Sequence, residues 1–168
     1  MNLKNLWLAI IAGGKGTRLF PISHSNCPKQ FCPLDSEKTF IQATVDRFKK
    51  IGVEAKNIVV ITTNDKQTAL AEDQLINRGI ISANIYQIED YYGYAGAMVK
   101  AAEFIRHYDD QAIIINSPAD QYIGNEENFV RTISLALEQF EEDKPTLIGY
   151  KTTDVTVADG RQQRLPGR

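Results

Sequence analysis

An apolar run that passes directly into a glycine-rich loop limits the fold of this chain more than any other part of its sequence. Residues 6–12 are all apolar, and residues 13–16 contain three glycines. A short apolar run bounded by glycines is typical of a central strand in a parallel sheet. Glycines let backbone N–H groups turn toward one point, and such nests bind anions, usually phosphate. Because Lys15 and Arg18 add positive charge, the stretch predicts a nucleotide site at the carboxyl end of a first strand.

The loop lacks the spacing of two common nucleotide-binding motifs. A P-loop needs four residues between its first glycine and Gly-Lys-Ser/Thr, and the dinucleotide fingerprint would need a glycine in place of Leu19. A simpler alternative is a glycine turn that joins a strand to the next element, since short glycine patterns also occur by chance. The glycine pattern alone leaves both interpretations open.

Strand-like and helix-like segments alternate along the first 150 residues. Apolar and β-branched runs predict further strands at 57–63, 84–88, 112–116 and 146–150. Apolar residues at helical spacing predict helices near 40–51, 65–78, 95–105 and 126–140. Such alternation implies an α/β protein with a mostly parallel sheet, helices on both faces and right-handed crossovers.

Polar and glycine residues mark the ends of these helices. We expect a capping box that begins at Thr39, and we expect N-caps at Asn64 and at Asn125. Gly52 and Gly79 follow two of the predicted helix ends. The apolar face expected for the third helix consists of Ala95, Met98, Val99, Ala102 and Ile105. The face expected for the fourth helix consists of Phe129, Ile133, Leu137 and Phe140.

Composition narrows the class of protein further. The chain of 168 residues is long enough for one domain with a hydrophobic core. Its formal net charge of −2 argues against a general nucleic-acid binder. Its apolar runs are too short to span a membrane, and its N-terminal residues lack the layout of a signal peptide. We therefore expect a cytoplasmic protein with no nucleic-acid or membrane partner.

The cysteines and histidines do not predict a metal or triad site. Cys27 and Cys32 form a single C-x4-C pair, which is a poor zinc site, and in a reducing compartment we expect both thiols to be free. His24 and His107 lie far apart and lack the spacing of a metalloprotease helix. The chemistry of this chain is therefore expected to come from its glycines, cations and carboxylates.

The longer string around the glycine loop resembles a known family signature. Residues 12–23 are AGGKGTRLFPIS, and Pro-Lys-Gln-Phe follows at 28–31. This string resembles the signature of the sugar-1-phosphate nucleotidyltransferases, and within them most of all the mannose-1-phosphate guanylyltransferases. Residues 117–120, Ser-Pro-Ala-Asp, resemble the second motif of the family, which is usually Leu-Pro-Ala-Asp. The resemblance extends over about residues 6–150.

The resemblance implies a Rossmann-like three-layer nucleotide-diphospho-sugar transferase fold with a mostly parallel sheet. It covers only the first part of the catalytic domain of the family, so we expect a fold that is truncated at its C-terminus. Residues 1–150 would form a nucleotidyltransferase-like nucleotide-binding domain. Residues 151–168 are unlike the family and hold few large apolar residues, so we expect a mobile tail there.

The resemblance also implies a reaction and a set of site residues. The reaction would transfer GMP from GTP to mannose-1-phosphate, giving GDP-mannose and pyrophosphate. Arg18 would stabilise the leaving pyrophosphate, and Lys29 would offset charge near the α-phosphate. Asp120 would hold Mg²⁺, which proteins bind through one or two carboxylates together with substrate phosphates. The implied nucleotide-binding residues are Ala12, Gly13, Gly14, Gly16, Thr17, Pro118 and Ala119.

The chemistry of such a reaction suits these residue types. A sugar phosphate is already an anion, so no serine or cysteine nucleophile is needed, and the protein must mainly hold two polyanions together. Both motifs follow predicted strands, so we expect them at the same edge of the sheet. An alternative for Asp120 is a structural turn after Pro118 and Ala119. Lys15 is as easily a solvated loop lysine as a ligand.

Departures from the family pattern leave the substrates open. Guanylyltransferases usually carry Gly-Arg-Asn-Thr-Ala-Pro-Ala before the third helix, whereas residues 91–97 here are YYGYAGA. Gln121 stands where the family often has histidine. The second metal-binding aspartate and the sugar-contacting residues of the family would lie beyond Tyr150 and have no counterpart.

Three functional classes therefore remain as alternatives. The first is a guanylyltransferase-type enzyme, or a related enzyme with another base or sugar. The second is a module that binds nucleotide without turnover. The third is an inactive fold fragment or an interaction protein, in which an exposed sheet edge would favour a homo-oligomer.

Overall fold

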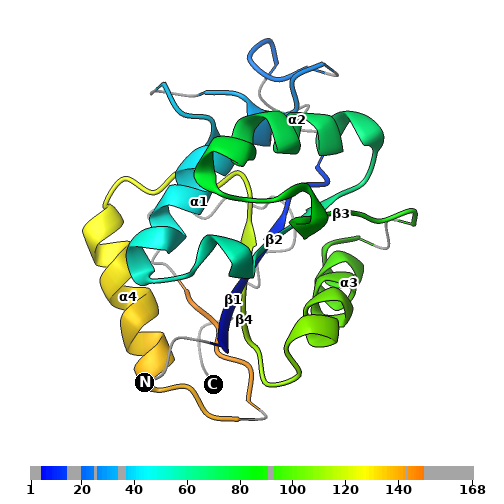
Figure 1. The fold of residues 1–168 in the computed structure, drawn as a ribbon. Coiled ribbons are helices and arrows are strands. Elements are labelled where there is room, and N and C mark those ends of the chain that lie inside the picture. Colours follow the sequence, from blue (N-terminus) through cyan, green and yellow to red (C-terminus); the bar gives the residue numbers. More distant parts are fainter. Residues whose placement is uncertain are drawn as a thin grey trace, which may run out of the picture.

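The computed structural model describes residues 5–14, 20–24, 26–33, 37–90, 93–142 and 144–149. Within them, four parallel strands form one sheet in the order β3-β2-β1-β4 (Figure 1). The strands are β1 (Leu6–Ile11), β2 (Ile58–Thr62), β3 (Ile85–Gln87) and β4 (Ile113–Pro118). Each lies where an apolar run predicts a strand, and the predicted α/β class is confirmed.

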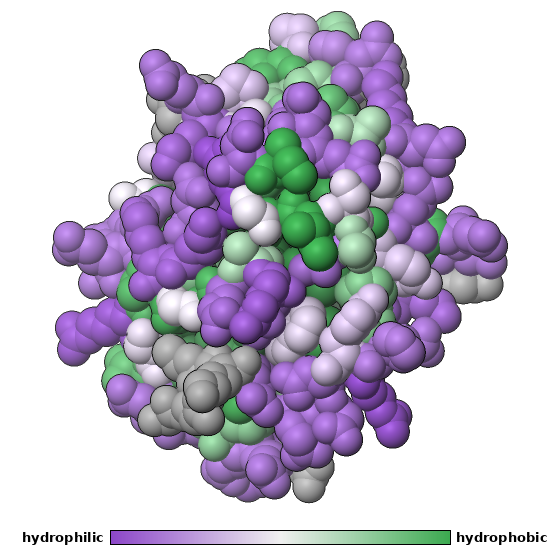
Figure 2. All heavy atoms as spheres, viewed as in Figure 1, coloured by the Kyte–Doolittle hydropathy of each residue, from purple (hydrophilic) through white to green (hydrophobic). Residues whose placement is uncertain are grey.

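In the described part of the chain, four α-helices cover the two faces of the sheet. They are α1 (Phe40–Ile51), α2 (Asp65–Leu75), α3 (Gly93–Tyr108) and α4 (Glu126–Glu138). Figure 1 shows α3 on one side of the sheet and α1 and α4 on the other. Figure 2 shows the same view as a mainly hydrophilic surface with a small apolar patch near its centre. The buried apolar side chains lie in two clusters, one on each face of the sheet.

Alternate side chains of β1 enter two separate core layers, as the pleat of a strand requires. On one face, Leu8 and Ile10 pack in a cluster with Val45 and Phe48 of α1, and α2 and α4 contribute to the same cluster. On the other face, the layer consists of residues from β1, β2, α3 and the segment after β3, among them Trp7, Ala9, Val59, Ala97 and Ile105. Every residue of β1 and β2 is buried, so both central strands are covered on both faces. The predicted Rossmann-like three-layer arrangement is confirmed.

The predicted capping residues are found at the helix ends. The backbone N–H of Thr39 donates to Gln42 Oε1 at 3.1 Å at the start of α1, and Gly52, with φ 104°, ends that helix. Asn64 Oδ1 accepts from the backbone N–H of Gln67 at 3.0 Å at the start of α2. Asn125 caps α4 in the same way. These side chains satisfy N–H groups that a helix leaves without partners in its first turn.

The face that α3 buries differs from the predicted one. The residues that it buries fully are Ala97, Ala101 and Ile105. Of the predicted face, Val99 is 56% exposed, and Ala95 and Ala102 are also exposed. Apolar residues occur all around this helix, so their spacing alone does not fix its orientation. The small alanines allow α3 to lie close to the sheet.

Two expectations near the C-terminal end are also wrong. Phe140 lies beyond the end of α4 and is 37% exposed. Residues 144–149 form no strand, and Leu147 is 91% exposed. A strand needs a hydrogen-bonded neighbour, and none of the strands that the structure describes pairs with this segment.

The prediction of a mobile C-terminal tail concerns residues that the structure does not describe. Tyr150 and residues 151–168 lie outside the described ranges, so the mobile tail stays a prediction. Within those ranges, none of the helices has the length and apolar character needed to cross a membrane.

Candidate functional site

The carboxyl ends of β1 and β4 bring the two sequence motifs together. Ile11 of β1 is paired with Pro118 of β4, and the N–H of Ala119 donates to the carbonyl of Ile11 at 3.2 Å. The residues that follow, Ala12 on one strand and Ala119 on the other, are both buried. The start of the glycine loop and Asp120 therefore emerge at the same edge of the sheet. This is the edge at which open α/β sheets bind ligands.

Gln30 holds the start of the glycine loop. Its Nε2 donates to the carbonyl of Ala12 at 2.5 Å and to the carbonyl of Gly14 at 3.1 Å. The side chain is almost completely buried, with 3% of the residue exposed, so these bonds satisfy an amide that would otherwise be costly to bury. Gln30 belongs to the Pro-Lys-Gln-Phe motif, but the sequence alone did not predict this role.

A second buried glutamine, Gln67 of α2, supports the same loop. Gln67 Nε2, at the start of α2, lies 3.4 Å from the carbonyls of both Gly13 and Gly14, and Thr63 Oγ1 donates to the carbonyl of Gly13 at 3.3 Å. Sequence analysis missed Gln67 and Thr63. The signal that points to Gln67 is the Asn64-x-x-Gln67 spacing, which is typical of a helix start.

These bonds also orient the loop amides. In a trans peptide the C=O of one residue and the N–H of the next point in opposite directions. Because side chains hold the carbonyls of Ala12 and Gly13, the N–H groups of Gly13 and Gly14 point away from those side chains. The loop thus offers backbone donors to whatever lies on its other side.

The two described glycines of the loop meet different constraints. A Cβ at Gly13 would lie 2.5 Å from Thr63 Cγ2, which leaves no room for a larger residue without rearrangement. A Cβ at Gly14 would meet nothing within 4 Å, and Gly14 is exposed. Packing therefore explains the glycine at position 13, whereas at position 14 the open backbone faces solvent.

Lys29 and Asp120 form an ion pair beside this loop. Lys29 Nζ lies 3.2 Å from Asp120 Oδ2, and the two side chains are 28% and 42% exposed. Lys29 is the first residue of the short 3-10 helix Lys29–Phe31, and its ammonium group lies 5.2 Å from the centre of the Phe40 ring. The structure thus brings into contact two charged residues that sequence analysis selected separately. An accessible cation and carboxylate at one rim can contact a phosphate and a metal ion, respectively.

A disulfide joins Cys27 to Cys32, which corrects the expectation of free thiols. Residues 28–31 turn back on themselves, with the N–H of Phe31 donating to the carbonyl of Pro28 at 2.9 Å. This turn brings the two Cα atoms to 6.1 Å, within the range that a disulfide spans. The covalent link closes the segment that carries Lys29 and Gln30.

Part of the predicted site lies outside the described residues, namely Gly16, Thr17 and Arg18, together with Lys15. Of the remaining predicted residues, Ala12, Gly13, Gly14, Lys29, Pro118, Ala119 and Asp120 all lie at the one sheet edge. In the part of the chain that the structure describes, no group of three or more His, Cys, Asp or Glu side chains could hold a metal ion. Asp120 alone could contribute one carboxylate.

Comparisons with known proteins give a consistent result. A sequence model described as nucleotidyl transferase matches residues 8–157. The chain is 31% identical to the xanthan biosynthesis protein XanB of Xanthomonas campestris pv. campestris over 145 residues, which are 86% of this chain and 30% of that protein. It is also 31% identical to a mannose-1-phosphate guanylyltransferase of Salmonella montevideo over 144 residues, again 86% of this chain and 30% of that protein.

A solved structure resembles the fold as well. It is described as mannose-1-phosphate geranyltransferase from Thermus thermophilus. The TM-score is 0.68 at 26% identity, and the match covers 82% of this chain and 39% of that chain. The chain thus spans about 30% of the length of each of the two curated relatives and 39% of the length of the solved structure.

Proposed function

Because this chain belongs to the nucleotidyl transferase family, we propose that its sheet edge binds a nucleoside triphosphate and directs transfer of the nucleotidyl group to a sugar-1-phosphate. We propose GTP and mannose-1-phosphate as the two substrates, since relatives that are 31% and 26% identical to this chain are named mannose-1-phosphate guanylyltransferase. The observation that carries the proposal is the Lys29–Asp120 pair beside the start of the glycine loop.

The proposed reaction forms one bond and breaks one bond at the α-phosphorus. An oxygen of the sugar-1-phosphate attacks this phosphorus, and the bond to the bridging oxygen of the β-phosphate breaks. Pyrophosphate leaves with the electron pair of that bond. No proton must be removed from the attacking oxygen, so the residues needed are ones that hold and neutralise anions.

The described residues fit these tasks. The N–H groups of Gly13 and Gly14 point away from the glutamines that fix the loop, and they would donate to phosphate oxygens. The Lys29 ammonium would offset charge near the α-phosphate, and Arg18 would do so at the leaving pyrophosphate. Held in place in advance, the Lys29 ammonium group and the two glycine N–H groups need no rearrangement as charge develops.

A magnesium ion fits the same edge through Asp120. The Asp120 carboxylate is a hard oxygen ligand, is 42% exposed and lies two residues after the end of β4. Mg²⁺ commonly binds through one or two carboxylates and completes its shell with water and substrate phosphates. When bound, the ion would neutralise phosphate charge. Lys29 would then be available to a phosphate oxygen instead of Asp120.

The test is a pyrophosphate-release assay with GTP, mannose-1-phosphate and Mg²⁺, repeated with other nucleoside triphosphates and sugar phosphates. Lys29→Ala is expected to lower kcat by about 10²-fold, the scale of losing one charge-stabilising donor. Lys56→Ala is the matched control, because Lys56 is an exposed lysine paired with Glu54 away from the edge. Absence of product from every substrate pair would exclude turnover by this chain.

A second candidate function is nucleotide binding without turnover. It is favoured by two findings: the described residues include no group of three or more His, Cys, Asp or Glu side chains that could hold a metal ion, and this chain spans only about 30% of its relatives. Calorimetry with GTP separates the two candidates. Saturable binding without pyrophosphate release would support the binding module, whereas release of pyrophosphate would support the enzyme.

A further inference from the structure

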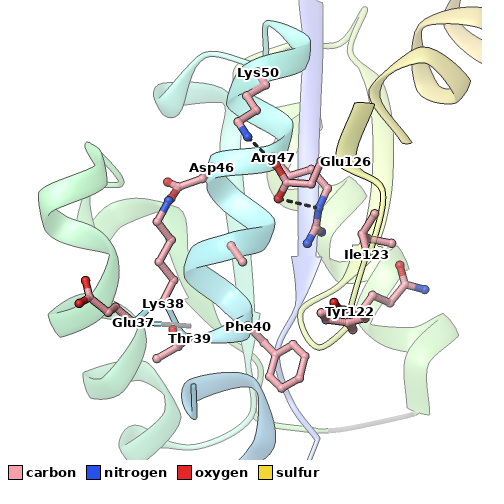
Figure 3. Close-up of a pocket in the computed structure, with 12 residues that line it drawn as sticks. Glu37, Lys38, Thr39, Phe40, Asp46, Arg47, Lys50, Tyr122, Ile123 and Glu126 are labelled. Carbon is pink, nitrogen blue, oxygen red and sulfur yellow. Dashed lines mark hydrogen bonds and ion pairs between the residues drawn. The ribbon is translucent and has the colours of Figure 1, made fainter. Parts of the chain in front are cut away.

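A second concave site lies along α1, on the side that faces the segment between β4 and α4. Figure 3 shows the side chains that surround it, and its volume is about 480 Å³. Helix α1 contributes an apolar floor and charged residues, and the segment after Asp120 contributes the opposite wall. Its lining includes Phe40, Ala43, Arg47, Tyr122, Ile123 and Glu126.

Arg47 is buried at this pocket with a donor that is not used. Its side chain is only 4% exposed, and its Nε has no hydrogen-bond partner among the residues that the structure describes. The nearest carboxylate oxygen, Glu126 Oε1, is 4.0 Å away, which is too long for a hydrogen bond. The guanidinium group lies 5.4 Å from the centre of the Phe129 ring. A buried guanidinium group with an unused donor is costly, so a missing partner is to be expected.

The neighbouring charges already have closer partners. Lys50 Nζ lies 2.5 Å from Glu126 Oε2, so Glu126 is shared and cannot serve Arg47 alone. Lys38 Nζ lies 2.8 Å from Asp46 Oδ2 on the other side of α1. Figure 3 shows the far end of the Arg47 side chain turned away from Glu126, toward the space between Phe40 and Tyr122. The open space of the pocket thus meets the guanidinium group.

We propose that this pocket is a second ligand site, separate from the glycine loop, in which Arg47 binds a small oxyanion carried on a compact organic body. The planar guanidinium group has five N–H donors and matches the two oxygens of a phosphate or carboxylate. Phe40, Tyr122 and Ile123 supply apolar contact for the body. Burial lowers the pKa of Arg47, which Glu126 raises again in part, and the group remains a cation.

The site adjoins the sheet edge without overlapping it. Gln121, which directly follows Asp120, lines the pocket, and the Phe40 ring lies under Lys29. A ligand that packs against Phe40 would therefore contact a side chain that also touches the proposed catalytic lysine. The pocket does not depend on the proposed transfer reaction, because none of its lining residues is assigned to that reaction.

The test is a titration with inorganic phosphate, and separately with acetate, followed by the backbone amide signals in a two-dimensional NMR spectrum. Saturable shifts are expected for amides near Ala43 and Arg47 and between residues 121 and 126. Arg47→Met should weaken binding at least tenfold. Arg131→Met, which removes the same charge from an exposed position on α4, should leave it unchanged. Tighter binding of phosphate than of acetate, or the reverse, identifies the class of anion.

A pocket-filling variant keeps the test decisive if Arg47→Met does not fold. Ala43→Phe leaves Arg47 in place but occupies the space beside it, and it should abolish the saturable shifts. Shifts that persist in Ala43→Phe, or that occur only around residues 12–14, would overturn the proposal. The second pattern would place the anion at the glycine loop and would instead favour the proposed nucleotide site.

Discussion

Gly13 is the residue at which packing and function meet in the glycine loop. A methyl group there would lie 2.5 Å from Thr63 Cγ2, whereas at Gly14 it would meet open space. Because Thr63 is β-branched and donates to the Gly13 carbonyl, it cannot move aside without losing that bond. We expect Gly13→Ala to lower the free energy of unfolding by about 1–3 kcal/mol, the usual cost of overpacking.

Urea denaturation measures this difference, and Gly14→Ala is the control. The control variant should change stability by no more than about 0.5 kcal/mol, as is usual for exposed positions without special contacts. Equal losses of stability in the two variants would contradict the steric argument. If Gly14→Ala keeps its stability but binds GTP more weakly, close approach of the ligand explains the second glycine.

The sequence predicts the charged residues of the site better than the residues that hold them. Lys29 and Asp120 both belong to recognisable sequence motifs. Asp120 also comes soon after the apolar run that predicts a strand. Gln67 comes from a helix in a different part of the chain, and its bond to the loop depends on how α2 lies over the sheet. Such a long-range contact leaves no mark in local spacing, except for the Asn64-x-x-Gln67 helix start.

At the scale of elements, an ion cluster joins α1 to the short 3-10 helix Ile76–Arg78 that follows α2. Burial alone would raise the pKa of Asp46, but hydrogen bonds from Lys38 and Arg78 lower it below its ordinary value. Arg78 Nε lies 3.0 Å from Asp46 Oδ1, and Lys38 Nζ lies 2.8 Å from Oδ2. Since the lowered pKa belongs to the folded state, the stabilisation is complete above the ordinary pKa of an aspartate. It is lost as the pH falls through the lower, folded-state pKa.

Asp46→Asn should therefore reduce stability at neutral pH but not at low pH. We expect a loss of about 0.5–1 kcal/mol at pH 7, as for a partly exposed pair, and convergence with the parent chain below the folded-state pKa. Unfolding by urea at a series of pH values measures both. Parallel stability curves for the two proteins down to the lowest pH would contradict the assigned pKa shift.

The disulfide is a property of the segment between the glycine loop and α1. We expect no thiol to react with a thiol reagent in denatured, unreduced protein, and two thiols to react after reduction, since both cysteines are paired. Closing so short a loop should contribute about 2 kcal/mol to stability. Urea denaturation with and without a thiol reductant measures this contribution of the disulfide to the free energy of unfolding. Two reactive thiols in the unreduced chain would show that Cys27 and Cys32 are not linked.

At the scale of the whole molecule, most of the architecture follows from the alternation of apolar runs and helical spacing. The motifs that follow β1 and β4 share a rim because parallel strands end on the same side. Prediction from the sequence fails where a feature depends on contacts that only the folded chain makes. The orientation of α3 depends on which of its apolar sides meets the sheet, and residues 144–149 lack a described strand to pair with. The disulfide depends on a turn that only the folded chain forms.

The two core layers share β1, so we expect the described fold to unfold as one cooperative unit. Trp7, the sole tryptophan, lies in the α3 layer, where its Nε1 donates to Asp109 Oδ2 at 3.0 Å. Far-UV circular dichroism mainly reports the helices, most of which cover the opposite face.

Ile41→Val and Ile105→Val delete the same buried methyl group on opposite sides of the sheet. Each should cost about 0.5–1.5 kcal/mol and shift the fluorescence and dichroism transitions equally. If Ile105→Val shifted the fluorescence transition alone, the α3 layer would unfold independently, and the shared strand would not couple the two layers.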